Sequence, residues 1–149
     1  MREVGERGLG EAIGRLTNSM TSDQWDLPFT EAIWWVVALR DSHGEIAKDE
    51  PLIHGVAWAR NFAAHDLILP GENDLTYSGI LGAGVLGRMR LGSGGLLVWV
   101  GVDSLPLSDW AKRHRGKVDK ERPFYDGYVA CQPLLDPLVK AQRFFVELP

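Results

Sequence analysis

Residues 30–44, TEAIWWVVALRDSHG, are the stretch that decides which fold the sequence predicts. Every residue from 32 to 39 is apolar, which suits a helix that is buried on most sides, either in this chain's core or against a partner chain. Such an apolar run is also compatible with a buried strand. Because Thr30 is a suitable N-cap and Gly44 a suitable stop, the stretch predicts a helix.

Apolar residues recur at helical spacing on both sides of this stretch. The first predicted helix carries a stripe of such residues: Leu9, Ala12, Ile13, Leu16 and Met20. A third predicted helix, PLIHGVAWARNFAAHDLIL at 51–69, begins at a proline, which is favoured in the first turn, and stops before Pro70. In a fourth, over 136–148, Asp136 is the expected cap and Pro137 the first helical residue. The chain is therefore predicted to be mainly α, a small bundle of about four helices.

The character of the sequence changes after Pro70, where glycines become frequent. Residues 88–91 alternate arginine with an apolar residue, and the apolar run LLVWVGV follows the turn sequence GSGG at 92–95. This pattern is typical of a β-hairpin, although the glycines are also consistent with a flexible loop. We therefore expect a β-hairpin or strand-rich insertion at about 75–102 in the helical bundle.

Length and composition indicate a single domain over residues 1–149. The hydrophobic fraction of 45% and the charged fraction of 24% are those of an ordinary globular protein. No apolar run reaches the length of a membrane-spanning helix, and the first residues lack the apolar core of a secretory leader. We therefore expect a cytoplasmic protein. The net charge of −4 argues against a protein that coats nucleic acid through a general positive field.

The sequence offers no obvious metal site. Cys131 is the only cysteine, and without an activating base nearby in sequence it is interpreted as a small apolar filler. His54 and His65 belong to one predicted helix, but three turns separate them by about 16 Å along the axis, so they cannot share one ion. We expect no metal and no other cofactor.

The third predicted helix carries side chains that are unusual for a core-packing surface. His54, Trp58, Asn61 and His65 follow one another at helical spacing and share one face, with Arg60 beside it. If these polar groups are buried, each needs a hydrogen-bond partner; if they are exposed, they form a polar site. This face is the candidate functional site.

The motif Arg60-Asn61-x-x-x-His65 resembles the signature of the HEPN superfamily. That signature is an arginine, four to six further residues and then a histidine, often with a polar residue directly after the arginine. The resemblance implies a metal-independent endoribonuclease, such as a toxin of a toxin–antitoxin pair or a defence protein. The 2′-hydroxyl of the RNA would be the nucleophile, and His65 the general base or acid. Arg60 would bind the scissile phosphate, and Asn61 would orient the phosphate or the imidazole.

The resemblance also implies partners. Family members usually pair two motifs across a homodimer, and the segment from Ile33 to Val37 is more apolar than one side of a helix requires, so we expect it to form that interface. An inhibitor protein is a further expected partner. His54 and Trp58 would contact the RNA. A basic cluster, which is also typical of a solvated mixed-charge surface, would add Lys112, Arg113 and Arg115 to the RNA contacts.

A non-catalytic interpretation stays open. In that case Arg60 takes part in a surface ion pair, His65 is merely hydrogen-bonded, and the chain is a helical interaction domain or a structural subunit that binds a protein. Arg60 and His65 lie about 140° apart around an ideal helix. A shared active site therefore requires that the arginine reach round the helix or that a partner subunit contribute.

Overall fold

Helices make up most of the described chain. The computed structural model describes residues 2–20, 24–66, 71–74, 77–79, 96–101 and 115–148. In chain order, the helices in these ranges are α1 (Arg2–Ser19), α2 (Asp26–His43), α3 (Glu45–Lys48), α4 (Pro51–Asp66), α6 (Arg115–Tyr128) and α7 (Leu135–Glu147). Within these residues, no helix is both long enough and apolar enough to cross a membrane. The mainly α class predicted from the sequence is confirmed.

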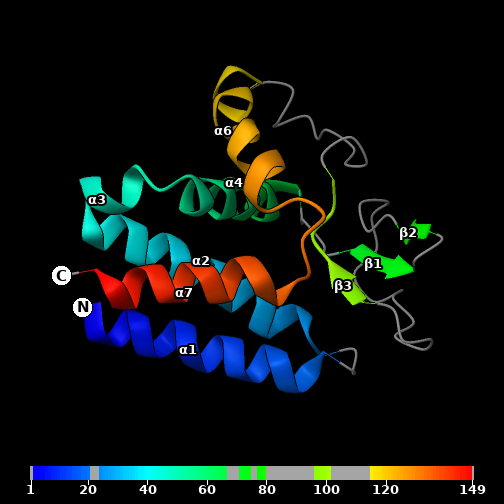
Figure 1. Cartoon of the computed structure of the whole chain (residues 1–149), viewed down its shortest axis with the longest axis horizontal. Coiled ribbons are helices and arrows are strands. Elements are labelled where there is room, and N and C mark those ends of the chain that lie inside the picture. Colours follow the sequence, from blue (N-terminus) through cyan, green and yellow to red (C-terminus); the bar gives the residue numbers. More distant parts are fainter. Residues whose placement is uncertain are drawn as a thin grey trace.

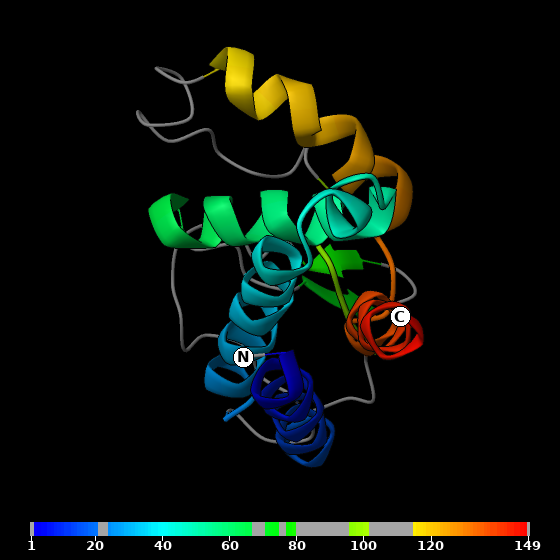
Figure 2. The same cartoon turned by 90° about the vertical axis from the view of Figure 1, so that its left-hand side faces the viewer.

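The helices pack around α2. α1 and α7 lie beside α2, and α4 crosses it on another side (Figure 1). α6 packs on α4, away from α1 (Figure 2). Arg2, at the start of α1, donates a hydrogen bond from Nη2 to the carbonyl oxygen of Leu148, just after α7. α1 and α7 are therefore antiparallel neighbours whose outer ends meet.

The stripe predicted for the first helix forms its buried side, and the last helix also buries one side. In α7, Leu138 and Phe145 are buried. This helix begins at Leu135, so Asp136 lies in its first turn instead of forming the cap. In α1 the buried stripe consists of Leu9, Ala12, Ile13 and Leu16. Burying a large aliphatic side chain contributes about 1.5–3 kcal/mol, which offsets the low helix propensity of the glycines in α1.

α2 begins one turn earlier than the sequence predicts. It starts at Asp26, and Pro28 lies in its first turn, where the missing N–H costs no helical hydrogen bond. Thr30, the predicted cap, lies inside the helix, and its Oγ1 donates to the carbonyl oxygen of Asp26 at 2.9 Å. The predicted end is confirmed, because the helix stops at His43 and Gly44 has a left-handed φ of 63°.

Three short strands lie between α4 and α6 in the sequence: β1 (Gly71–Asp74), β2 (Tyr77–Gly79) and β3 (Leu96–Val98). They pair antiparallel in the order β2-β1-β3, at one end of the helices (Figure 1). Residues 80–95, the centre of the insertion expected at 75–102, lie outside the described residues. The hairpin expected there stays a prediction.

The chain after β3 is fixed to the connection between α6 and α7. Leu134 N donates to Leu97 O at 2.8 Å, Trp99 N to Gln132 O at 3.0 Å, and Cys131 N to Trp99 O at 2.9 Å. The indole of Trp99 is buried, and its Nε1 donates to Leu134 O at 3.0 Å. These bonds satisfy the polar groups of a segment that crosses the core.

α6 is the long helix that the sequence does not predict; the short α3 is also not predicted. The residues at its start have mixed charges, and Pro123 lies inside it, which is typical of a helix break. Its apolar side is short and includes Tyr125, with Val129 buried just past its end. Gly55 of α4 allows a close approach, because a Cβ there would lie 2.9 Å from the carbonyl oxygen of Phe124.

Cys131 is not the apolar filler that the sequence predicts. It is exposed in the turn between α6 and α7, where its φ of 60° is the left-handed conformation that few residues other than glycine adopt. Its backbone N–H is bonded to Trp99, which fixes the turn. The backbone conformation and this hydrogen bond thus determine the position, and the residue stays exposed.

Candidate functional site

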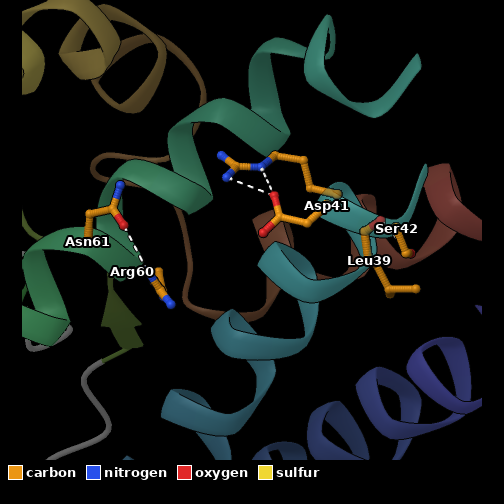
Figure 3. Close-up of polar contacts among 6 residues, drawn as sticks. Leu39, Asp41, Ser42, Arg60 and Asn61 are labelled. Atoms are coloured by element: carbon orange, nitrogen blue, oxygen red, sulfur yellow. Dashed lines mark hydrogen bonds and ion pairs between the residues drawn. The ribbon is translucent and has the colours of Figure 1, made fainter. Parts of the chain in front are cut away.

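Arg60 and Asn61 are joined by a side-chain hydrogen bond on α4. Arg60 Nη1 donates to Asn61 Oδ1 at 3.0 Å, and both residues are half-buried (Figure 3). Asn61 and His65 are four residues apart and so lie on the same side of the helix. This hydrogen bond joins two of the three predicted catalytic residues; the side chain of His65 is not among those that the structure describes.

Trp34 of α2 provides the second contact of this guanidinium. Arg60 Cζ lies 3.9 Å from the centroid of the Trp34 ring, and the indole is 46% exposed. A cation–π contact at an exposed site is worth about 0.5–1 kcal/mol. The contact of Trp34 with Arg60 could not be predicted from helical spacing, because it depends on how α2 and α4 pack.

The charge of Arg60 is not neutralised by any carboxylate among the described side chains. Its Nε is buried and has no hydrogen-bond partner there. Four other arginines do have acidic partners: Arg2 pairs with Glu6, Arg15 with Glu31, Arg40 with Asp41 and Arg122 with Asp126. Arg60 is thus a partly desolvated cation that an anion would complete.

At the end of α2, the side chains of Arg40, Asp41 and Ser42 have hydrogen-bond partners. Asp41 accepts hydrogen bonds from Arg40 Nε at 3.2 Å and Nη2 at 3.1 Å, and Ser42 Oγ donates to the carbonyl oxygen of Leu39 (Figure 3). These groups are satisfied within the helix. Arg60, in contrast, has no carboxylate partner among the described side chains.

The other half of the predicted polar face packs against α6. Trp58 is 2% exposed, and its ring centroid lies 4.7 Å from that of Tyr125. His54 is half-buried and stacks on Phe124 at 4.9 Å, and its Nδ1 has no hydrogen-bond partner among the described residues. The predicted RNA contact of Trp58 is therefore corrected: its indole is part of the core, because α6 covers this side of α4.

The remaining predicted site residues fall outside the described side chains. His65 belongs to α4 and Arg115 to α6, but only their backbones are described. Lys112 and Arg113 lie outside the described residues. The catalytic role of His65 and the RNA contacts of the basic cluster stay predictions. Among the described residues, no three His, Cys, Asp or Glu side chains are grouped as metal ligands.

The segment from Ile33 to Val37 is not the free apolar surface that predicted a homodimer. Ile33, Val36 and Val37 are buried within the chain, because α2 lies between α1, α4 and α7. Trp35 is partly buried against the same core. Trp34 is the exposed member of the segment. Packing within one chain thus explains most of its apolar character.

The chain was compared with known proteins. It matches no family model, no curated protein and no solved structure. The HEPN resemblance therefore depends on Arg60, Asn61 and His65 alone.

Proposed function

We propose that this chain is a metal-independent endoribonuclease of the HEPN type, with Arg60, Asn61 and His65 as its catalytic residues. The observation that carries the proposal is the guanidinium of Arg60, which is held by Trp34 and Asn61 and has no carboxylate partner among the described side chains. A phosphate is the anion that a guanidinium fork binds well. The same helix carries a histidine, which can transfer protons near neutral pH.

In the proposed reaction the 2′-hydroxyl of RNA attacks the adjacent phosphorus, and the bond from phosphorus to the 5′-oxygen breaks. The products are a 2′,3′-cyclic phosphate and a 5′-hydroxyl. His65 takes the proton of the 2′-hydroxyl or gives one to the leaving oxygen. Arg60 stabilises the charge on the phosphate oxygens. Asn61 accepts from Arg60 through Oδ1, so its Nδ2 is the atom that donates to the phosphate or the imidazole.

The proposal includes the partners that the resemblance implies. RNA is the substrate, and a protein that is a toxin or defence factor in the cytoplasm would be held in check by an inhibitor protein. A homodimer would bring two motifs together. Sedimentation that shows a monomer at high micromolar concentration would contradict the dimer.

Cleavage of single-stranded RNA in EDTA tests the catalytic assignment. Wild-type protein is expected to cut, and His65→Ala and Arg60→Ala are each expected to lower the rate by about 100-fold or more. His65→Ala should change the free energy of unfolding by less than about 0.5 kcal/mol, because an exposed catalytic side chain contributes little to packing. Arg60→Ala should lower it by about 0.5–1 kcal/mol, because it also removes the contact with Trp34. Arg15→Ala, which removes an exposed paired arginine, is the matched control and should cut normally.

The same experiment contains the outcome that would overturn the proposal. Wild-type protein that leaves every RNA intact, together with a His65→Ala variant that is clearly destabilised, would favour a structural histidine. The second candidate function is then protein binding without catalysis. The observation that favours it is the exposure of Leu27 and Trp34, seven residues apart on one side of α2.

A further inference from the structure

The proposed catalytic residues leave the exposed part of Trp34 without a function. The guanidinium of Arg60 lies over the indole, 3.9 Å from its centroid, yet 46% of this residue remains open to solvent. Its position on α2 is also not that of a core residue, because Ile33 and Val36, on other sides of the helix, are the buried ones. A large exposed ring beside an uncompensated cation is suited to a ligand that has both an aromatic part and a negative charge.

The neighbours of Trp34 on α2 do not obstruct such a ligand. The residues one turn before and one turn after it are Thr30 and Ala38, which are small and exposed. Glu31, the nearest acid on this side of α2, is paired with Arg15. A flat aromatic group would therefore meet neither a bulky side chain nor an uncompensated carboxylate from these positions.

We propose that Trp34 stacks an unpaired base of the RNA whose phosphate binds Arg60. The inference rests on the proposed function and deepens it, because it names single-stranded RNA as the substrate class. Each nucleotide joins a flat base to a phosphate, which matches an indole beside a guanidinium. Bases in duplex RNA are stacked on one another and do not reach such a ring, whereas unpaired bases do.

The overall charge of the chain supports the same assignment. With a net charge of −4, the protein has no general positive field to attract a polyanion. Affinity for RNA must then come from local contacts. Stacking of a base on an aromatic side chain does not depend on net charge, and it tolerates any base sequence because every base has a π face.

Binding of intact and abasic RNA tests the inference. The RNA is a single strand that wild-type protein cuts at a mapped position, with a 2′-deoxy group at the cleaved nucleotide so that it binds uncut. Abasic versions lack the base on one or the other side of the scissile phosphate. Wild-type protein should bind one of them about 5-fold to 150-fold more weakly than intact RNA in fluorescence anisotropy.

Substitutions of Trp34 distinguish two roles of its ring: stacking on an RNA base and holding the guanidinium of Arg60. Trp34→Leu should bind intact and abasic RNA equally, and Trp34→Tyr should keep most of the preference for the intact strand. Leu27→Ala removes another exposed apolar residue from α2 and should leave the preference unchanged. If Trp34→Leu weakens the binding of both RNAs by the same factor and leaves their ratio unchanged, Trp34 acts only through Arg60, and the stacking assignment is wrong.

Three further outcomes overturn the inference in distinguishable ways. Wild-type protein that neither cuts nor binds RNA removes the proposed function and the stacked base with it. Wild-type protein that cuts RNA, but binds duplex or abasic RNA as tightly as an intact single strand, removes only the stacked base. A Trp34→Leu substitution that converts a dimer into a monomer in sedimentation would assign Trp34 to a subunit interface instead.

Discussion

Tyr125 shows how one polar atom is accommodated in the core. Its ring is buried, and its hydroxyl donates to the carbonyl oxygen of Val100 at 2.7 Å. Tyr125→Phe leaves that carbonyl without a partner and should lower the free energy of unfolding by about 1–3 kcal/mol, measured by urea unfolding. The matched control is Tyr128→Phe in the same helix. Loss of this exposed hydroxyl should change the free energy of unfolding by less than about 0.5 kcal/mol. Equal effects of the two changes would contradict the buried bond.

The same residue predicts a loss of stability at alkaline pH. Burial raises the pKa of Tyr125 far above its usual value, and the nearby charges of Cys131 and Asp126 raise it further. The unfolded chain releases this proton at about pH 10, whereas the folded protein retains it. The contribution of Tyr125 to the free energy of unfolding is therefore fully present below about pH 10 and decreases as the pH rises further.

Tyr125→Phe should remove this contribution to the pH dependence. The difference in unfolding free energy between wild type and the variant is expected to narrow between about pH 10 and pH 11. The phenolate absorbance of the folded wild-type protein should show one tyrosine that does not titrate in this range. Ordinary titration of every tyrosine while the protein stays folded would contradict the raised pKa.

The contact between α4 and α6 depends on a position without a side chain. A Cβ on Gly55 would lie 2.9 Å from the carbonyl oxygen of Phe124 and 2.8 Å from Val129 Cγ2. Gly55→Ala is therefore expected to separate the helices and to destabilise the protein by about 1–3 kcal/mol. Chemical denaturation with a near-ultraviolet circular dichroism spectrum would show both effects.

Gly14 provides the matched control in α1. A Cβ at this position meets nothing within 4 Å. Gly14→Ala should instead stabilise the protein by about 0.5–1 kcal/mol, because alanine loses less backbone entropy in a helix. If both alanines were stabilising, the close approach of α4 and α6 would not exist in solution.

The helices that could be predicted from the sequence are those with a long apolar stripe or a clear end signal. The stripe that begins at Leu9, the proline at position 51 and Gly44 each indicate local structure that needs little tertiary information. α6 lacks such a stripe: it is held mainly by Tyr125 and contains Pro123, so its helical state depends on α4.

The candidate site divides in the same way. Helical spacing was sufficient to place Asn61 and His65 on one side of α4 and to put Arg60 next to them. It was not sufficient to show that Trp58 is buried, because α6 supplies the ring that covers it. The contact of Arg60 with Trp34 was also beyond prediction, since it joins two helices whose crossing is set by the whole core.

At the scale of the molecule, the meeting of the two ends of the chain has a consequence for folding kinetics. The bond from Arg2 to Leu148 joins residues 146 positions apart, so α1 and α7 form the most non-local helix pair in the described chain. Loop-closure entropy makes such a pair slow to form. During synthesis, α1 must wait for the final helix before its partner surface is complete.

A circular permutant would reverse this order. A short linker from residue 149 to residue 1, with new ends between Lys48 and the exposed Asp49, turns α7 and α1 into sequence neighbours. Stopped-flow refolding should then be faster than for the natural order, because the slowest closure has become a local helical hairpin. Unchanged refolding rates would mean that the α1–α7 contact forms after the rate-limiting step. Faster refolding would mean that the order of the helices along the sequence, rather than the set of contacts between them, determines the folding rate of this bundle.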